Sequence, residues 1–120
     1  MTARTLEAHV RYKPPVAIID LHGEITPFAE NALNAAYAEA EKGDAHVILL
    51  NFSDVDYINS TGIALIVSLL TRARKSDRRL LACGLSEHYV EIFHITRLVD
   101  FMDIFPDEMS ALANEVSSLL

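Results

Sequence analysis

Phe52–Lys75, with the sequence FSDVDYINSTGIALIVSLLTRARK, is the stretch around which the rest of the chain is organised. Its first half contains Asp54, Asp56 and Asn59, which disfavour strands and predict a loop. Its second half has apolar residues at helical spacing and predicts an amphipathic helix. The expected stripe on that helix is formed by Ile63, Ile66, Val67, Leu70 and Ala73. The stretch therefore predicts a loop that leads into a helix beginning near Ser60.

Ser60 stands at the junction of loop and helix and is followed by Thr61 and Gly62. A serine here is a natural N-cap, because its hydroxyl can accept a hydrogen bond from a free backbone N–H, and most serines at helix starts have only this role. The position also suits a phosphate, since a helix N-terminus offers unpaired N–H groups and a positive dipole end. Gly62 is a poor helix former, and its lack of a side chain would let another protein approach the hydroxyl.

Leu65 and Leu69 lie off the apolar stripe, so the predicted helix is apolar on more than one face. A helix that is apolar nearly all round is either buried or has another surface docked on it. A hydroxyl beside a surplus apolar face therefore indicates a regulated binding surface.

The composition indicates a globular protein, with 51% hydrophobic and 22% charged residues in 120, and residues 1–120 are expected to form a single domain. The formal net charge of −7 argues against direct binding of nucleic acid, which needs a basic surface. The one cysteine, Cys83, falls in an apolar run and is expected to be buried and inert. No signal-peptide core and no apolar run near the length of a membrane span are present, so a cytoplasmic location is expected.

The remaining segments divide into strands and helices by their apolar periodicity. The expected strands are Leu6–Tyr12, Val16–Leu21, Val47–Leu50, Arg79–Cys83 and Phe101–Phe105, and a turn at Pro14-Pro15 makes the first two a hairpin. The other expected helices run from Thr26 to Gly43, from Ser86 to Leu98 and from Asp107 onward. Strands that alternate with helices imply crossover connections. We therefore expect an α/β fold with a mixed, mostly parallel sheet of about five strands, four helices and the hairpin at one side.

Two of these helices have predicted buried faces. In the helix from Thr26 the face is Ala29, Leu33, Ala36, Tyr37 and Ala40. In the last helix it is Met109, Leu112, Ala113, Val116 and Leu120. Helices on one side of so small a sheet would leave its other side partly open, which makes that side a candidate partner or dimer surface.

Catalytic and metal-binding motifs are missing from the sequence. The five histidines are scattered, and the chain has no Cys-x-x-Cys pair, no Gly-x-Ser-x-Gly elbow, no Walker loop and no dinucleotide fingerprint. Asp54 and Asp56 could orient a base or a metal, but turn chemistry explains them more simply. The basic cluster from Arg72 to Arg79 is interpreted as a solvated patch rather than a phosphate or lipid site. We therefore expect no enzymatic activity, no metal site and no cofactor.

Three segments resemble a known family. Val47–Ile66, with the sequence VILLNFSDVDYINSTGIALI, is similar to the signature of STAS domains of the anti-sigma-factor antagonist type. Gly23-Glu24-Ile25 resembles the Gly-Glu-Leu element of that family, and Ser86–Leu98 resembles its third helix. The resemblance covers about residues 6 to 116 and implies a fold of four helices on a mixed sheet, which agrees with the fold expected from the periodicity.

The resemblance also implies a function. A partner serine/threonine kinase, which is also the anti-sigma factor, would phosphorylate Ser60, with Thr61 as a second candidate acceptor. The unphosphorylated form would bind the kinase and so free the sigma factor, and a serine phosphatase would reset the switch. The family also includes non-catalytic scaffold subunits of stress-sensing complexes and small subunits of lipid-transport systems. A homo-oligomer or a larger STAS assembly is a further expectation for this chain.

The expected partner-binding surface surrounds the serine. It consists of Glu24, Thr26, Asp56, Asn59, Gly62, Leu65 and Leu69. The family usually has Asp where this chain has Asn59, and often has Asp where it has Thr26, so this chain has less negative charge near the serine. A phosphate would add about −1.5 to −2 charge there, and its expected effect is to repel a docked partner rather than to refold the domain.

Overall fold

The computed structural model describes residues 4–119, with side chains up to residue 115. Its centre is a five-stranded sheet in the order β1-β2-β3-β4-β5. The strands are β1 (Glu7–Lys13), β2 (Val16–Ile25), β3 (Val47–Ile58), β4 (Arg79–Cys83) and β5 (Asp103–Phe105). β1 and β2 form an antiparallel hairpin, and the other neighbours are parallel. The expected mixed, mostly parallel sheet with the hairpin at one side is confirmed.

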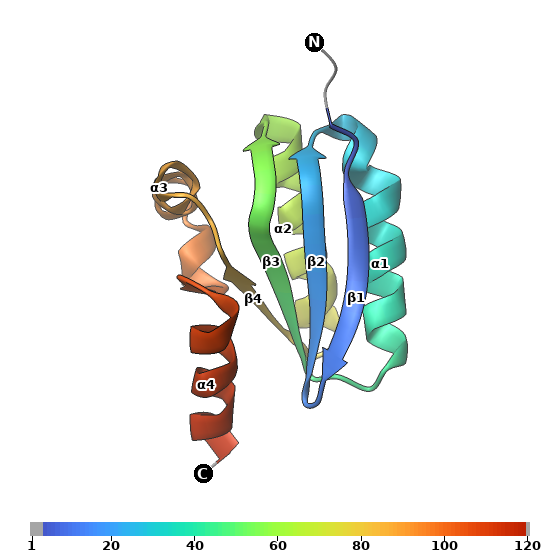
Figure 1. Cartoon of the computed structure of the whole chain (residues 1–120), viewed down its shortest axis with the longest axis vertical. Coiled ribbons are helices and arrows are strands. Elements are labelled where there is room, and N and C mark those ends of the chain that lie inside the picture. The colour runs from blue at the N-terminus through green and yellow to red at the C-terminus, as the bar shows by residue number, and fades with distance from the viewer. Residues whose placement is uncertain (1–3, 120) are drawn as a thin grey trace.

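The described residues form four α-helices and two short 3-10 helices. They are η1 (Pro27–Ala29), α1 (Glu30–Lys42), α2 (Ser60–Lys75), α3 (Glu87–Ile95), η2 (Leu98–Asp100) and α4 (Glu108–Leu119). Figure 1 shows α1 and α2 together behind β1, β2 and β3. α4 packs on the opposite face, where Ala111 is buried against the sheet. None of these helices has the length and the apolar character needed to cross a membrane.

The sheet separates two apolar cores because side chains of a strand alternate between its faces. On the α1 and α2 side, the strands contribute residues such as Ile19 and Leu50, and Phe93 of α3 completes the packing. On the α4 side, Ile18 and Leu49 pack with Ala111. Because β2 and β3 contribute to both cores, Val16–Ile19 and Val47–Leu50 are buried continuously, as expected for a central strand covered on both faces.

Helix-capping residues predicted from the sequence are present in α1 and α3. Thr26 caps η1, where its hydroxyl accepts a hydrogen bond from Phe28 N, and Pro27 occupies the first helical position. η1 runs directly into α1, which ends at the cap Gly43. Ser86 caps α3 in the same way. The predicted buried face of α1 is confirmed: its core side chains are Ala29, Leu33, Ala36, Tyr37 and Ala40.

The loop predicted between Phe52 and Asn59 is wrong, because β3 continues to Ile58. This second half of β3 pairs with the end of β2, up to the Ile25–Ile58 pair, with two register shifts on the way. Asp54 and Asp56 stay exposed on this extension and form ion pairs with Arg4. Residues that disfavour strands are therefore tolerated here, since their carboxylates remain in water and pairing with β2 satisfies the backbone.

The predicted face of α4 is wrong for Met109 and Ala113, whereas Leu112 packs on the core as predicted. Met109 is 81% exposed, whereas Ala111 and Glu115 are buried against the sheet. Ala113 is exposed, Leu112 is half-buried, and the side chains of Val116 and Leu120 lie outside the described residues. The ion pairs of Glu108 with Arg11 and of Glu115 with Arg79 act together with the apolar packing of Ala111 and Leu112, and both hold this face of the helix against the sheet.

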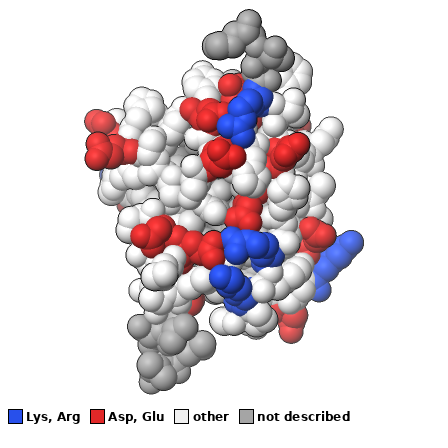
Figure 2. All heavy atoms as spheres, in the orientation of Figure 1, with Lys and Arg blue, Asp and Glu red and all other residues white. Residues whose placement is uncertain are grey.

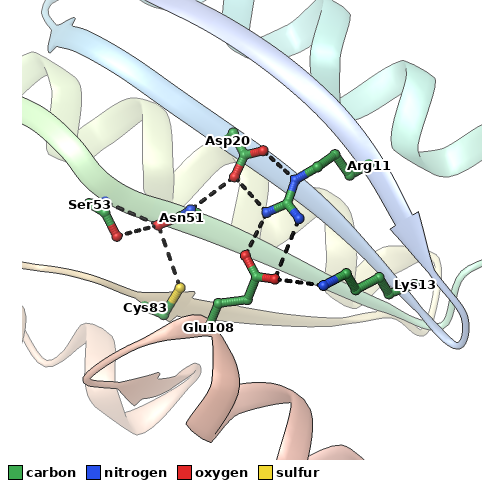
Figure 3. Close-up of polar contacts among 7 residues, drawn as sticks. All are labelled: Arg11, Lys13, Asp20, Asn51, Ser53, Cys83 and Glu108. Atoms are coloured by element: carbon green, nitrogen blue, oxygen red, sulfur yellow. Dashed lines mark hydrogen bonds and ion pairs between the residues drawn. The ribbon is translucent and has the colours of Figure 1, made fainter.

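A polar network holds the start of α4 against the sheet (Figure 3). The guanidinium of Arg11 binds Asp20, with Nε 2.5 Å and Nη2 2.9 Å from its oxygens, and Nη2 lies 2.5 Å from Glu108. Asn51 donates to Asp20 over 2.9 Å, and Lys13 lies 3.2 Å from Glu108. These hydrogen bonds from Arg11 hold the pKa values of both Asp20 and Glu108 below their ordinary range. The part of this sheet face expected to be open is thus occupied by a charged network and by α4.

Replacing Arg11 with methionine should make the stability less sensitive to acid. Carboxylates with depressed pKa values stabilise the fold above their unfolded pKa, about 4, and this stabilisation is lost as the pH falls through the folded pKa. We expect Arg11→Met to lower the free energy of unfolding at pH 7 by about 1 kcal/mol, allowing for the partial exposure of Arg11. We also expect a shallower decline in stability between pH 5 and pH 2, measured by urea unfolding.

Arg97→Met is the matched control for this experiment, since Arg97 pairs only locally with Asp100 and its side chain is 78% exposed. It should leave the pH profile unchanged. Equal acid sensitivity of Arg11→Met and the unmodified protein would contradict the role given to Arg11.

Candidate functional site

The start of α2 is held by the ends of two strands. β2 and β3 finish side by side at Ile25 and Ile58, and the next residue, Asn59, donates its backbone N–H to the Ile25 carbonyl over 3.2 Å. From the other side, the Ile58 N–H donates to the Tyr89 hydroxyl of α3 over 2.8 Å. Ser60 follows as the first residue of α2, with an exposed side chain. The serine is therefore presented to solvent from a backbone that is fixed on both sides.

The N-cap of α2 is Asn59 and not Ser60 as predicted. The Asn59 side-chain oxygen accepts from Gly62 N over 2.8 Å, and its backbone carbonyl accepts from Ile63 N over 3.0 Å. Asn and Asp are equally good caps, so Asn59 secures the helix without placing a negative charge beside the serine. The Ser60 hydroxyl forms no hydrogen bond with any residue that the structure describes. It is available for chemistry that leaves the helix cap intact.

Gly62 is buried, so it does not belong to an exposed partner surface as predicted. A Cβ at this position would overlap the Ile25 carbonyl oxygen and would lie 2.9 Å from a methyl group of Ile58. The glycine lets the first turn of α2 pack directly on the ends of β2 and β3. Gly62 therefore has a packing role: its close contact with the strand ends fixes the position of Ser60 relative to the sheet.

The surplus apolar face predicted from Leu65 and Leu69 is also a buried face. Leu69 is 2% exposed, and Leu65 is half-buried and packs against the core. The large apolar side chain that is exposed on α2 is instead Val67, at 42%, which the sequence pattern assigns to the buried stripe. The reason is that α2 contacts both the sheet and α1, so a wide arc of the helix is covered.

Phe28 is an exposed aromatic residue that the sequence reasoning missed. It lies in η1, which packs against α2, and it is 90% exposed. The signal was present in the sequence: Phe28 directly precedes Ala29 but lies off the helical spacing of the buried face that begins there. A large exposed aromatic side chain next to an exposed helix start is typical of a contact residue. Thr26, whose hydroxyl caps η1, positions this residue.

The acidic residues before the serine are paired. Arg4 lies 2.6 Å from Asp56 and 3.1 Å from Asp54, and His22 Nδ1 lies 2.8 Å from Asp54. The hydrogen bonds from His22 and then Arg4 lower the pKa of Asp54. Figure 2 shows acidic side chains gathered at the upper end of this face, close to a basic one. Glu24 is half-buried in the same part of β2, opposite Tyr57 of β3, which is 48% exposed.

Elsewhere in the described residues, the groups that could bind a metal or an anion, or act as a nucleophile, are absent, buried or already paired. No cluster of three His, Cys, Asp or Glu that could hold a metal occurs there. Cys83 is fully buried, and burial raises the pKa of its thiol to about 12, so it stays protonated. In the basic cluster, Arg72 and Arg78 pair with Glu41, and Arg79 pairs with Glu115 and Asp103. These pairs favour a structural role for the cluster over an anion site.

Replacing Gly62 with alanine should destabilise the protein, although alanine is the better helix former. The added methyl group would force the start of α2 away from the Ile25 carbonyl. Overpacking of this kind costs about 1–3 kcal/mol. Thermal unfolding should show a clear fall in Tm. Thr61→Ala, one position earlier and exposed, is the control and should change Tm little. An unchanged or raised Tm for Gly62→Ala would contradict the packing role.

Comparison with known proteins identifies the family. A family model described as STAS domain matches residues 7–111. The chain is 28% identical over 86 residues to an anti-sigma-B factor antagonist of Staphylococcus epidermidis, and the match covers 72% of this chain and 80% of that protein.

Two solved structures share the fold. An anti-sigma factor antagonist from Mycobacterium paratuberculosis superposes with a TM-score of 0.79 at 17% identity, covering 92% of this chain and 93% of that one. The phosphorylated form of the Bacillus cell fate determinant SpoIIAA superposes with a TM-score of 0.68 at 19% identity, covering 89% of this chain and 97% of that one. Because the family model matches most of the chain and the sheet order is shared with structures of this fold, the chain belongs to the STAS domain family.

Proposed function

We propose that this chain is an anti-sigma factor antagonist whose binding to a partner kinase is switched by phosphorylation of Ser60. The observation that carries the proposal is the exposed Ser60, whose hydroxyl forms no hydrogen bond with the residues that the structure describes and which stands at the first position of a capped helix. Relatives named anti-sigma-B factor antagonists support the class of function. A protein of this fold, SpoIIAA, has been solved in a phosphorylated form, which supports a serine switch.

The geometry of the helix start is compatible with a phosphate on Ser60. The first backbone N–H groups of α2 have no acceptor within the helix, and the helix dipole is positive at this end. Asn59 caps through Gly62 N and carries no charge, so it adds no repulsion. Because the serine hydroxyl supports no internal contact, its modification leaves the fold intact. The resulting signal is a local change of about −1.5 to −2 in charge.

The docking surface that we infer is formed by exposed residues around the serine. Ser60 and Thr61 lie at its centre, and Phe28 and Val67 supply apolar contacts. Glu24, Thr26 and Asp56 stand at its edge. Gly62 and Leu69, being buried, are not part of it. A partner pressed against this surface would have to desolvate a phosphate, which is strongly unfavourable without a compensating cation.

The proposed cycle needs three other proteins, which are the kinase, the sigma factor and a phosphatase, and this chain catalyses no step of it. The unmodified form binds the serine/threonine kinase that is also the anti-sigma factor, and the sigma factor is released. The kinase transfers phosphate to Ser60, with Thr61 as the neighbouring alternative acceptor, and then dissociates from this chain. A serine phosphatase restores the binding form. Co-purification from native cells, with mass-spectrometric mapping of the modified residue, would identify the kinase and the acceptor together.

The two states of the switch can be mimicked by substitution. Ser60→Ala should bind the kinase with an affinity close to that of the unmodified protein, and Ser60→Asp should bind at least about tenfold more weakly. Isothermal titration calorimetry measures both. Ser68→Asp is the matched control, since Ser68 is an exposed residue two turns further along α2. Equal binding by Ser60→Ala and Ser60→Asp would refute the switch.

Phe28 should be a hot spot for the kinase. Truncating an aromatic anchor at an interface typically costs 2 kcal/mol or more, which is about thirtyfold in Kd. Phe28→Ala should show this loss with no change in Tm, because the side chain is already 90% exposed. Ile95→Ala, at a position 71% exposed on α3, controls for loss of surface apolar area. If Phe28→Ala binds the kinase as tightly as the unmodified protein, η1 lies outside the interface.

A further inference from the structure

The outer edge of β1 faces no other strand within residues 4–119, because β1 is first in the sheet order. β1 pairs residue by residue with β2, from Glu7–His22 to Lys13–Val16, without a register shift. It contains no proline and no glycine. Natural proteins protect exposed edges with bulges, prolines or very short strands. The other edge follows this rule, since β5 has three residues and is followed by Pro106. β1 has no bulge or proline and is seven residues long, so its charged residues Glu7, Arg11 and Lys13 are what restricts pairing at this edge.

The charged residues of β1 complement a second copy of the same strand. Side chains of a strand alternate between faces, so Glu7 and Lys13 lie on one face at opposite ends of β1. In an antiparallel pair centred on Val10, Glu7 of each copy lies opposite Lys13 of the other. A parallel pair in register would place like charges opposite each other, which is unfavourable. The pattern therefore selects antiparallel pairing.

The register centred on Val10 is also favoured over its neighbour. Moving the centre to His9 would place Glu7 opposite Arg11, but the Arg11 guanidinium is already bound to Asp20 and Glu108. Lys13 is 54% exposed, and its contact with Glu108 leaves donors of the ammonium group available. Lys13 can therefore donate to a second carboxylate while it keeps its contact with Glu108.

The other face of β1 has space for the side chains that this register brings in. A groove of about 560 Å³ runs between the first half of β1 and α1, and four alanines of α1 line it: Ala32, Ala35, Ala36 and Ala38. Figure 1 shows α1 running beside the outer edge of β1. With the centre at Val10, Tyr12 of the second copy lies opposite Ala8, and the helix side of the groove consists of these alanines together with Glu39 and Lys42. A large residue thus faces a small one in both halves of the pair.

We propose that two copies of this chain associate through their β1 strands, antiparallel and centred on Val10, so that one sheet runs through both. The pairing places Glu7 against Lys13 twice and satisfies the free backbone groups of the edge. Because the two strands run in opposite directions, the two Ser60 residues lie at opposite ends of the joined sheet. Both remain accessible, so the association is independent of the proposed phosphorylation switch.

Charge reversal with rescue tests the pairing by sedimentation velocity over a concentration series. The unmodified protein should dimerise. Glu7→Lys and Lys13→Glu should each raise the dimer Kd by about tenfold, because each puts like charges opposite each other twice. An equimolar mixture of the two variants should form a heterodimer, since every cross-strand pair is then of opposite charge. The double variant should recover the original dimer affinity for the same reason. No intramolecular effect predicts recovery on mixing.

Matched controls are available on other surfaces. Glu91→Lys and Lys75→Glu change the net charge equally at exposed positions away from β1 and should leave the Kd unchanged. Hydrogen exchange of β1 amides should slow as the concentration rises. A protein that stays monomeric throughout the series would overturn the proposal. So would a dimer that is insensitive to Glu7→Lys and is lost with Met109→Glu, which would assign the interface to the exposed face of α4.

Discussion

The parallel pairing of β2 with β3 through to Ile25 and Ile58 is the constraint on which the serine end of the molecule depends. It brings the Ile25 carbonyl to the start of α2, where the oxygen accepts from Asn59 N and lies against Gly62. Asn59 then caps the helix, so the Ser60 hydroxyl is not needed as the N-cap. Ser60 is exposed, its hydroxyl forms no hydrogen bond with the described residues, and its backbone position is held by the strand ends. Each of these properties follows from backbone pairing several residues away.

The opposite face of the sheet adds ion pairs to the apolar packing of Ala111 and Leu112. Arg11 joins Asp20 of β2 to Glu108 of α4, and Arg79 joins β4 to Glu115. Together with that packing, these pairs determine which side of α4 faces the sheet, and they leave Met109 in solvent. The ion pairs make the attachment of α4 directional, and the pair of Glu108 with Arg11 makes it dependent on pH. The core on the side of α1 and α2 has no comparable dependence, because it consists of apolar side chains.

The sequence was sufficient for the architecture, and it correctly predicted that a helix begins at Ser60. Apolar periodicity located all five strands, the buried face of α1 and the start of α2, because these patterns reflect burial directly. The extension of β3 was missed because Asp54 and Asp56 disfavour strands locally, and only pairing with β2 outweighs this preference. The face of α4 was missed in part because its orientation depends also on arginines that are distant in sequence. The burial of Leu69 and Gly62 depends on contacts between α2, α1 and the strand ends, which periodicity in one helix does not contain.

The hydrogen bond from Ile58 N to the Tyr89 hydroxyl ties the last residue of β3 to α3. A buried amide that lost this acceptor would destabilise the strand end by about 1–3 kcal/mol. The segment that fixes the serine in space therefore extends well beyond the Ser-Thr-Gly stretch, to a phenol 29 positions downstream of Ser60. A graft of the loop and α2 alone into another scaffold would carry the serine but not its support. The third helix is therefore part of the structural support of Ser60, through the hydrogen bond that Tyr89 accepts from the end of β3.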